Sequence, residues 1–226
     1  MESTTVALPR KSTNGRTNST PLGVRALRAW FRVAATVAPR AAERQAASLF
    51  LTPRRKRHAG RALEDAAAGW YALTVRDGGA EVAAWSWGAG PAVLLAHGWG
   101  GSAADMAPLA GALEGAGYRA ILFDFPAHGR SAGRRTSMVE WLRAMRAMAA
   151  AVGPLHAMVG HSFGGAAVAL ALAEAGVEAR GAVLLAPAAG PTLFAEHFTA
   201  AIGLPAARAA GMMRRVAEIV GREPAS

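Results

Sequence analysis

Short apolar runs alternate with longer segments of helical periodicity through the middle of the chain. The runs are typical of strands buried on both faces, and they cover residues 92–96, 119–123, 155–159 and 181–185. Between them, helical segments are predicted over about 103–116, 137–151 and 163–176. This alternation predicts an α/β fold, with a mostly parallel twisted sheet and helices on both faces.

A β-hairpin is expected before the first of these runs. Residues 70–76 and 81–87 are strand-like, and Asp77-Gly78-Gly79 between them favours a tight turn. Together with the four apolar runs, this gives six strands. We assign residues 62–190 to this core.

The flanking segments are predicted to be helical or unstructured. Residues 1–23 are polar, rich in Ser, Thr and Asn, and predicted to be disordered. Residues 24–61 are predicted to form a helical arm, divided by Pro39 and ended by a charged linker that begins at Pro53. Residues 191–226 are predicted to be helical and to start a cap or lid.

The basic charge of the chain is concentrated in its first quarter. The formal net charge is +10, and residues 1–61 hold 13 Lys and Arg against two Glu. Arg25, Arg28 and Arg32 share one helix face. The simplest interpretation is a solvated face, and weak contact of residues 24–61 with an anionic membrane surface is the alternative. Because aromatic residues are not interleaved at nucleic-acid spacing, we expect no nucleic-acid partner.

Several classes of chemistry are excluded by composition. The chain contains no cysteine, so disulfides, thiolate metal sites and cysteine nucleophiles are absent. It shows neither an apolar secretion signal nor a run of about 18 apolar residues, and we expect a cytoplasmic protein. Asp105 and Asp124 are too isolated to indicate a metal site. No phosphate loop or dinucleotide fingerprint occurs, so no cofactor is expected.

The strongest chemical signal surrounds Ser162. The segment Gly160-His161-Ser162-Phe163-Gly164-Gly165 follows an apolar strand and opens a helix. A serine at a sharp strand-to-helix turn projects its hydroxyl above the sheet, while Gly160 and Gly164 allow close approach of the neighbouring backbone. The pattern predicts that Ser162 is a nucleophile, with His161 as a supporting residue of the turn.

A second loop is expected to face this serine. The strand at 92–96 ends in His97-Gly98-Trp99-Gly100-Gly101, a loop that can turn a backbone N–H toward the nucleophile. We therefore predict that the N–H groups of Trp99 and Phe163 form an oxyanion hole. His97 and Gly98 are expected to support the loop by packing and hydrogen bonding.

These motifs resemble those of the α/β-hydrolases of the esterase and lipase type. His97-Gly98-Trp99-Gly100 is similar to the family's oxyanion loop, and Gly160 to Gly165 to its nucleophile elbow. Residues 124–131, Asp-Phe-Pro-Ala-His-Gly-Arg-Ser, resemble the segment after its fourth strand. The resemblance covers about residues 70–190 and implies that the six strands are the first six of the family's eight.

The resemblance does not extend to a complete catalytic triad. In the family, the acid follows the seventh strand and the histidine follows the eighth. After Pro187 the chain has 39 residues, predicted to be helical, so we expect the sequence to stop before the acid and the base. His197 is the only histidine after Ser162, and the candidate acids Glu174, Glu178 and Glu196 are unsuitably placed.

Two functions from different classes are compatible with this pattern. The first is a serine hydrolase that acts on a small acyl substrate, most simply a carboxylic ester, through an acyl-enzyme on Ser162. The second is a catalytically inactive, truncated hydrolase-fold protein that binds a ligand or an anionic surface. Because Ser162 has no identified base, we expect this chain to react slowly with serine-directed probes.

Overall fold

A six-stranded sheet forms the centre of the computed structural model, which describes residues 20–55, 71–77 and 80–221. The strands are β1 (Tyr71–Asp77), β2 (Ala80–Trp87), β3 (Ala92–Ala96), β4 (Arg119–Phe123), β5 (Leu155–His161) and β6 (Ala179–Leu185). Their order is β1-β2-β4-β3-β5-β6. β1 pairs antiparallel with β2 and β2 antiparallel with β4, whereas β3 to β6 are parallel. The predicted α/β fold is therefore confirmed.

Helices cover both faces of this sheet. Successive strand residues point to opposite faces, so each face has its own hydrophobic core. Val93 and Leu95 pack on the face of α4 (Ala107–Gly115) and the short 3-10 helix η1 (Ala103–Met106). Leu94 and Ala96 pack on the opposite face, beneath α5 (Met138–Val152) and α6 (Phe163–Ala173). Every residue of β3 is buried, which explains why its sequence is apolar without interruption.

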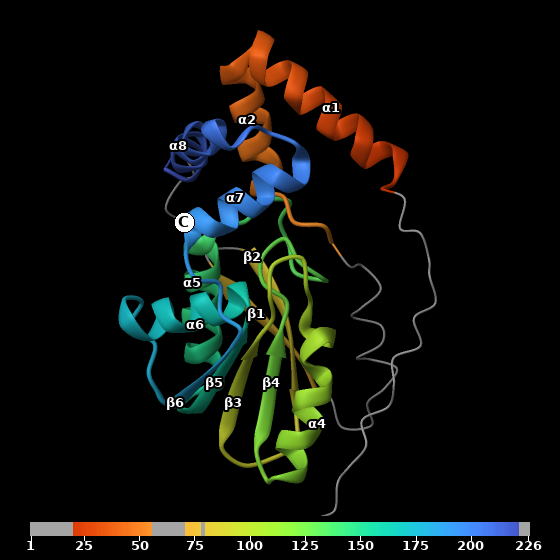
Figure 1. Ribbon diagram of the computed structural model, residues 1–226. Coiled ribbons are helices and arrows are strands. Elements are labelled where there is room, and N and C mark those ends of the chain that lie inside the picture. The colour runs from red at the N-terminus through yellow and green to blue at the C-terminus, as the bar shows by residue number, and fades with distance from the viewer. Residues whose placement is uncertain (1–19, 56–70, 78–79, 222–226) are drawn as a thin grey trace, which may run out of the picture.

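Four further helices gather at the end of the sheet toward which the parallel strands run (Figure 1). They are α1 (Leu22–Val37), α2 (Pro39–Phe50), α7 (Pro191–Ile202) and α8 (Ala209–Val220), and we call them the cap helices. The 3-10 helix η2 (Ala206–Arg208) joins α7 to α8. Phe31, Ala46, Ile202 and Met212 are buried together in a hydrophobic core distinct from the two cores on the faces of the sheet.

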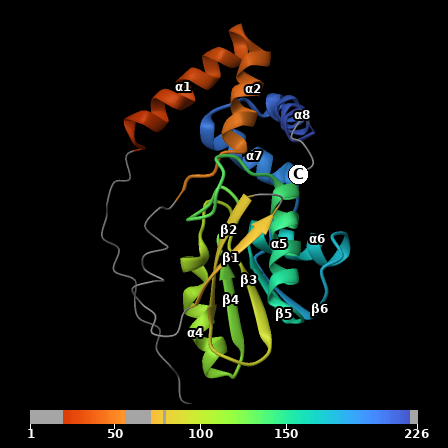
Figure 2. The same cartoon turned by 180° about the vertical axis from the view of Figure 1, so that it is seen from behind.

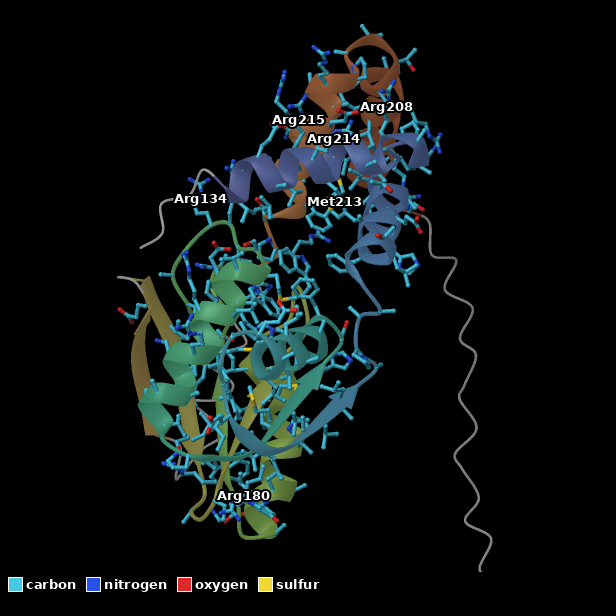
Figure 3. The ribbon with its side chains drawn as sticks, turned by 90° about the vertical axis from the view of Figure 1, so that its left-hand side faces the viewer. Arg134, Arg180, Arg208, Met213, Arg214 and Arg215 are labelled. Atoms are coloured by element: carbon cyan, nitrogen blue, oxygen red, sulfur yellow. The ribbon has the colours of Figure 1, made fainter. Side chains whose placement is uncertain are left out.

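The N-terminal and C-terminal segments therefore share one hydrophobic core. Glu43 of α2 is 6% exposed, and its carboxylate lies 3.6 Å from the Arg208 guanidinium. Figure 3 shows Arg208 at the junction of these helices, with Arg214 and Arg215 on α8. Nε of Arg28 donates to the carbonyl of Ala201 at 2.9 Å. This association was not anticipated from the sequence.

The segment after α2 also joins the cap helices to the core. Arg55 donates from Nη2 to the carbonyls of Ser131 (2.5 Å) and Gly133 (2.9 Å) in the loop after β4. The Thr136 N–H donates to the Leu51 carbonyl at 2.9 Å. One end of the predicted charged linker is thus bound to the loop that precedes α5.

The element boundaries agree closely with those expected. α1 begins at Leu22, two residues before the predicted start of the arm, and Pro39 separates it from α2 as predicted. The predictions for residues 1–19, 56–70, 78–79 and 222–226 lie outside the described residues. Among the helices that the structure describes, none has the length and apolarity needed to cross a membrane.

Candidate active site

Ser162 lies at an abrupt turn between β5 and α6. β5 ends at His161 and α6 begins at Phe163, so Ser162 alone makes the connection. Its φ is 53° and its ψ is −119°, a conformation that non-glycine residues rarely adopt. Its N–H donates to the Leu185 carbonyl at 2.9 Å, and its carbonyl accepts from the Ala188 N–H at 3.1 Å. The main chain is therefore held on both sides of the serine.

The glycines on either side of Ser162 are required by close backbone contacts. A Cβ atom at Gly160 would lie 2.5 Å from the Gly164 carbonyl oxygen. A Cβ atom at Gly164 would lie 2.3 Å from the carbonyl oxygen of His97, in the loop after β3. Both distances are far below van der Waals contact, so only glycine allows the strand, the turn and the neighbouring loop to approach this closely.

The loop after β3 forms a tight turn beside the serine. The Gly101 N–H donates to the Gly98 carbonyl at 2.9 Å, and Gly100 has a φ of +70°. A Cβ atom at Gly98 would lie 3.2 Å from Cβ of Ser162, so the loop touches the serine. Trp99 is the second residue of the turn, and its N–H takes no part in the hydrogen bond that closes the turn. Phe163 is the first residue of α6, where the N–H has no partner within the helix.

Two buried histidines hold this loop against the loop after β4. Nε2 of His128 accepts from the Gly100 N–H at 3.0 Å, and its Nδ1 lies 3.0 Å from the Pro126 carbonyl. Nε2 of His97 accepts from the Phe125 N–H at 3.1 Å, and its Nδ1 lies 2.8 Å from the Gly98 carbonyl. Both rings are therefore neutral, with the proton on Nδ1.

The electrostatic environment of His128 agrees with this assignment for that ring. Burial lowers the pKa of His128 to about 4, so that it stays uncharged at neutral pH. Each ring uses both nitrogens for main-chain groups. Neither histidine is therefore placed to take a proton from Ser162.

Asp124 has a comparable structural position at the end of β4. Its carboxylate accepts from the Ala103 N–H at 2.7 Å and from the Arg130 N–H at 2.8 Å. Burial raises the pKa of Asp124, and the two main-chain hydrogen bonds oppose that effect. Because the side chain fixes η1 and the loop after β4, it lies within the scaffold of the site and not at its reacting centre.

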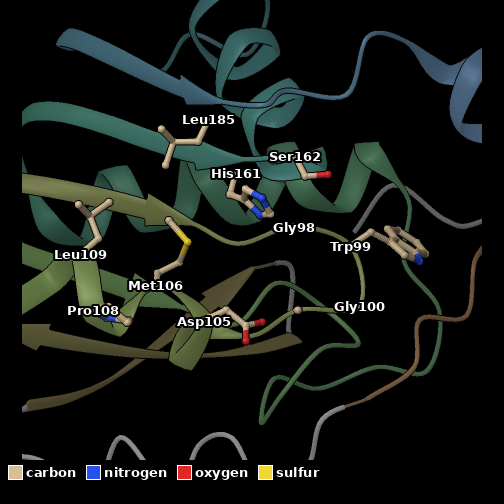
Figure 4. Close-up of a pocket in the computed structure, with 11 residues that line it drawn as sticks. Gly98, Trp99, Gly100, Asp105, Met106, Pro108, Leu109, His161, Ser162 and Leu185 are labelled. Carbon is tan, nitrogen blue, oxygen red and sulfur yellow. The ribbon is translucent and has the colours of Figure 1, made fainter. Parts of the chain in front are cut away.

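A cavity of about 510 Å³ opens beside Ser162. Ser162, His161 and the Gly98–Gly101 turn line one part of it, and Met106, Pro108, Leu109 and Leu185 line the other. Figure 4 shows that the Ser162 hydroxyl points away from Leu185, toward the end of the cavity where Trp99 lies. The cavity thus combines polar main-chain groups near the serine with an apolar wall.

The Trp99 side chain connects the core to the cap helices. Its ring centroid lies 5.3 Å from that of Phe163, 5.9 Å from that of Trp141 and 6.0 Å from that of Phe194 on α7. Phe50 of α2 stacks on the same indole at 6.4 Å. The cap helices therefore lie directly above the loop that carries a predicted oxyanion donor. Phe50 and Phe194 were not predicted to be site residues, because only the packing of the two distant helices brings them to the site.

The acid and base candidates that follow Ser162 in the sequence do not line the cavity. His197 and Glu196 are exposed on α7. Glu174 is the C-cap of α6, at the end opposite Ser162, and Glu178 precedes β6. Asp105 and His161 both line the cavity. Among residues 20–55, 71–77 and 80–221, no group of three or more His, Asp and Glu fits a metal ion.

The chain is similar to proteins that share one fold. Residues 91–218 match the sequence profile of a family described as alpha/beta hydrolase fold. A solved esterase of Pyrococcus furiosus is 19% identical, with a TM-score of 0.54 over 68% of this chain and 63% of that one. No curated protein matches.

Two further solved structures have lower TM-scores. An epoxide hydrolase from an endophytic Streptomyces is 27% identical (TM-score 0.48), over 52% of this chain and 37% of that one. An esterase from Exiguobacterium antarcticum is 21% identical (TM-score 0.49), over 53% of this chain and 46% of that one. The chain thus spans less than half the length of these two proteins.

Proposed function

This chain belongs to the α/β-hydrolase fold family, and we propose that it is a serine hydrolase that cleaves small carboxylic esters through an acyl-enzyme on Ser162. The observation that carries the proposal is the conformation of Ser162, alone between β5 and α6 with a φ of 53° and beside an open cavity. A strained turn of this kind exposes the hydroxyl and brings the first N–H groups of a helix close to it.

The proposed reaction proceeds in two steps. Oγ of Ser162 attacks the ester carbonyl carbon and gives its proton to a base. The carbon–oxygen bond to the leaving group then breaks, and the base returns the proton to that oxygen, so that an alcohol leaves. Water then attacks the resulting serine ester and releases the acid. In both steps the N–H groups of Trp99 and Phe163 donate to the carbonyl oxygen as it becomes negative, and each such donor contributes about 10²- to 10³-fold in rate.

The chemistry of serine favours an ester over an epoxide or a haloalkane. An acyl group transferred to a hydroxyl forms an ester, which water can cleave by attack at the carbonyl carbon. An alkyl group transferred to the same hydroxyl would form an ether, which has no carbonyl carbon for water to attack. The apolar wall formed by Met106, Leu109 and Leu185 suits the hydrocarbon part of a small acyl substrate.

The general base and its acid partner are not assigned to residues of the described chain. His97 and His128 are bonded to main-chain groups through both ring nitrogens. The oxyanion donors and the bound geometry alone leave a residual acceleration on the order of 10³-fold over water. An added small base that can enter the open cavity should therefore increase the reactivity of Ser162.

Covalent labelling with a fluorophosphonate tests the proposal. We expect mass spectrometry to locate a slowly formed adduct on Ser162 of the folded protein, and we expect added imidazole to accelerate its formation. Ser162→Ala should abolish this adduct, whereas Ser48→Ala, a matched change in α2, should leave it unaffected. Labelling of Ser162 no faster than in the unfolded chain, with and without imidazole, would count against a catalytic role.

The second candidate is a hydrolase-fold protein that binds a ligand without turnover. It is favoured by the hydrogen bonds of His97 and His128, because each ring uses both nitrogens for main-chain groups and so cannot take a proton from Ser162. An ester analogue that binds in a Ser162-dependent manner, without forming an acyl-enzyme even in imidazole, would support this alternative.

A further inference from the structure

The helix α1 carries a second apolar face that the protein core does not use. Phe31 and Ala35 point inward and are 0% and 4% exposed. On the opposite side, apolar residues recur at intervals of four, four, three and four, which places them on one helix face. This outer face of α1 consists of Leu22, Ala26, Trp30, Val33 and Val37.

The side chains of this outer face are unusually accessible for their type. Leu22 is 80% exposed, Val37 79%, Val33 64% and Trp30 50%. Figures 1 and 2 show α1 at the outer edge of the cap helices, with α2 and α7 on its inner side. A continuous apolar stripe of this kind, including a half-exposed tryptophan, indicates an interaction surface.

Positive charge flanks the stripe on α1 and continues onto α2. Arg25 and Arg32 are exposed on α1, and Arg40 and Arg44 are exposed on α2. Glu43 is the only acidic residue in the sequence from 20 to 55, and it is buried next to Arg208. Within residues 20–55, the exposed charged side chains are therefore all cationic.

We propose that the outer face of α1 binds the surface of an anionic lipid bilayer, with α1 parallel to the membrane plane. An amphipathic helix of this composition buries its apolar side chains about 5–10 Å into the boundary between headgroups and acyl chains. Tryptophan favours this depth, and arginines at the margins pair with anionic headgroups.

The same charges disfavour the other occupants of the face. A second copy of the chain packed through this stripe would bring Arg25 and Arg32 of both copies together, with no exposed carboxylate from residues 20–55 to separate them. Binding to nucleic acid would use the arginines and leave Trp30, Val33 and Val37 exposed. Only a partner that is both apolar and anionic matches the whole surface. The proposal does not depend on the reaction at Ser162.

Vesicle binding by the full chain tests the proposal. Phosphatidylcholine vesicles containing about one quarter phosphatidylserine should bind the protein, pure phosphatidylcholine vesicles should bind it more weakly, and added salt should release it. Val33→Ser should weaken binding about tenfold, because a buried valine side chain is lost from the bilayer. The matched control is Val139→Ser, which changes an exposed valine of α5 that is 43% accessible.

The cationic margin is tested in the same assay. Arg25→Gln and Arg32→Gln should each weaken binding about fivefold, and Arg146→Gln on α5 is the matched control. All of these positions are exposed or partly exposed, and thermal unfolding should show that each variant remains folded.

Three outcomes would overturn the proposal. The first is a lack of binding to the anionic vesicles at low salt. The second is binding that falls with the arginine changes and does not respond to Val33→Ser, which would indicate a purely electrostatic surface that also accepts nucleic acid. The third is that the wild-type protein is an oligomer, that Val33→Ser converts it to a monomer, and that neither protein binds vesicles. This result would show that the face binds a second copy of the chain.

Discussion

Gly164 lies where any side chain would strike the main chain of a neighbouring loop. A Cβ atom there would lie 2.3 Å from the His97 carbonyl oxygen and 2.5 Å from that of Ala96. We expect Gly164→Ala to lower the free energy of unfolding by at least about 3 kcal/mol, because backbone atoms of β3 and α6 must separate.

Gly115→Ala is the matched control for this change. A Cβ atom at Gly115, the last residue of α4, meets no atom within 4 Å. Stability should therefore be unchanged or slightly raised, since alanine favours helix over glycine. Chemical denaturation of both variants measures the difference. Equal effects of the two changes would contradict the close approach of α6 to the loop after β3.

The lowered pKa of His128 predicts that the free energy of unfolding decreases at acid pH. Its pKa falls from an ordinary 6.5 to about 4 in the folded protein, so the unfolded chain takes up a proton first as the pH decreases. The stability that depends on neutral His128 is therefore complete above pH 6.5 and is lost as the pH falls to about 4. The loss reaches at most about 3 kcal/mol.

Replacement of His128 by glutamine should remove this dependence. His128→Gln retains an acceptor for the Gly100 N–H and cannot titrate, so its free energy of unfolding should fall less steeply between pH 6.5 and 4. Denaturation at a series of pH values measures both slopes, and His197→Gln on the exposed side of α7 is the matched control. Parallel decreases in the wild type and His128→Gln would assign the acid sensitivity to other groups.

The positions around Ser162 could be predicted from the sequence to different degrees. The turn at Ser162 and its neighbouring loop were predicted because they depend on local motifs, in which glycine spacing reports backbone geometry directly. The hydrogen bonds of His97 and His128 could not be predicted, since each joins two loops that are 28 residues apart. A sequence motif specifies a local conformation, but it does not specify which distant main-chain group a side chain reaches.

At the scale of elements, α2 and α8 pack through a contact that depends on one glycine. A Cβ atom at Gly211 would lie 2.3 Å from Cδ of Glu43. Gly211→Ala should therefore displace the buried carboxylate from Arg208 and lower the free energy of unfolding by about 2 kcal/mol.

A double-mutant cycle isolates that contact. In the Glu43→Ala background the space for the new methyl group is open, so Gly211→Ala should cost less than about 0.5 kcal/mol. Thermal or chemical unfolding of the four proteins gives the coupling free energy. Additive effects would show that the cost arises from the backbone of α8 and not from its contact with α2.

The same pair of helices shows what the sequence could establish about the fold. Apolar periodicity predicted helices in residues 24–51, and the alternation of strands and helices predicted the sheet. Periodicity does not identify the partner of a buried face. Residues 24–61 were therefore expected to form a separate arm, whereas α2 packs on α8, more than 150 residues later in the chain.

At the scale of the whole molecule, the sheet ends in a strand that is accessible on both faces. Val183 is 50% exposed, and Leu184 and Leu185 are each 41% exposed. Successive strand residues point to opposite faces, so neither face of β6 is covered at this point. Within the described residues no strand pairs with the outer side of β6. An apolar edge with exposed main-chain donors and acceptors favours association between sheets.

The exposed edge of β6 predicts that the 226-residue protein self-associates as its concentration rises. Val183→Lys places a charge on this edge, and the charge would lose its hydration if two sheets paired there. The variant should therefore associate about tenfold more weakly, which is equivalent to about 1.4 kcal/mol. Val139→Lys adds the same charge at a valine of α5 that is 43% exposed, so it controls for the change in net charge. Sedimentation velocity over a range of concentrations distinguishes the two variants. Equal effects would attribute association to general charge repulsion, and a wild-type protein that stays monomeric throughout would show that the β6 edge is protected without a partner strand.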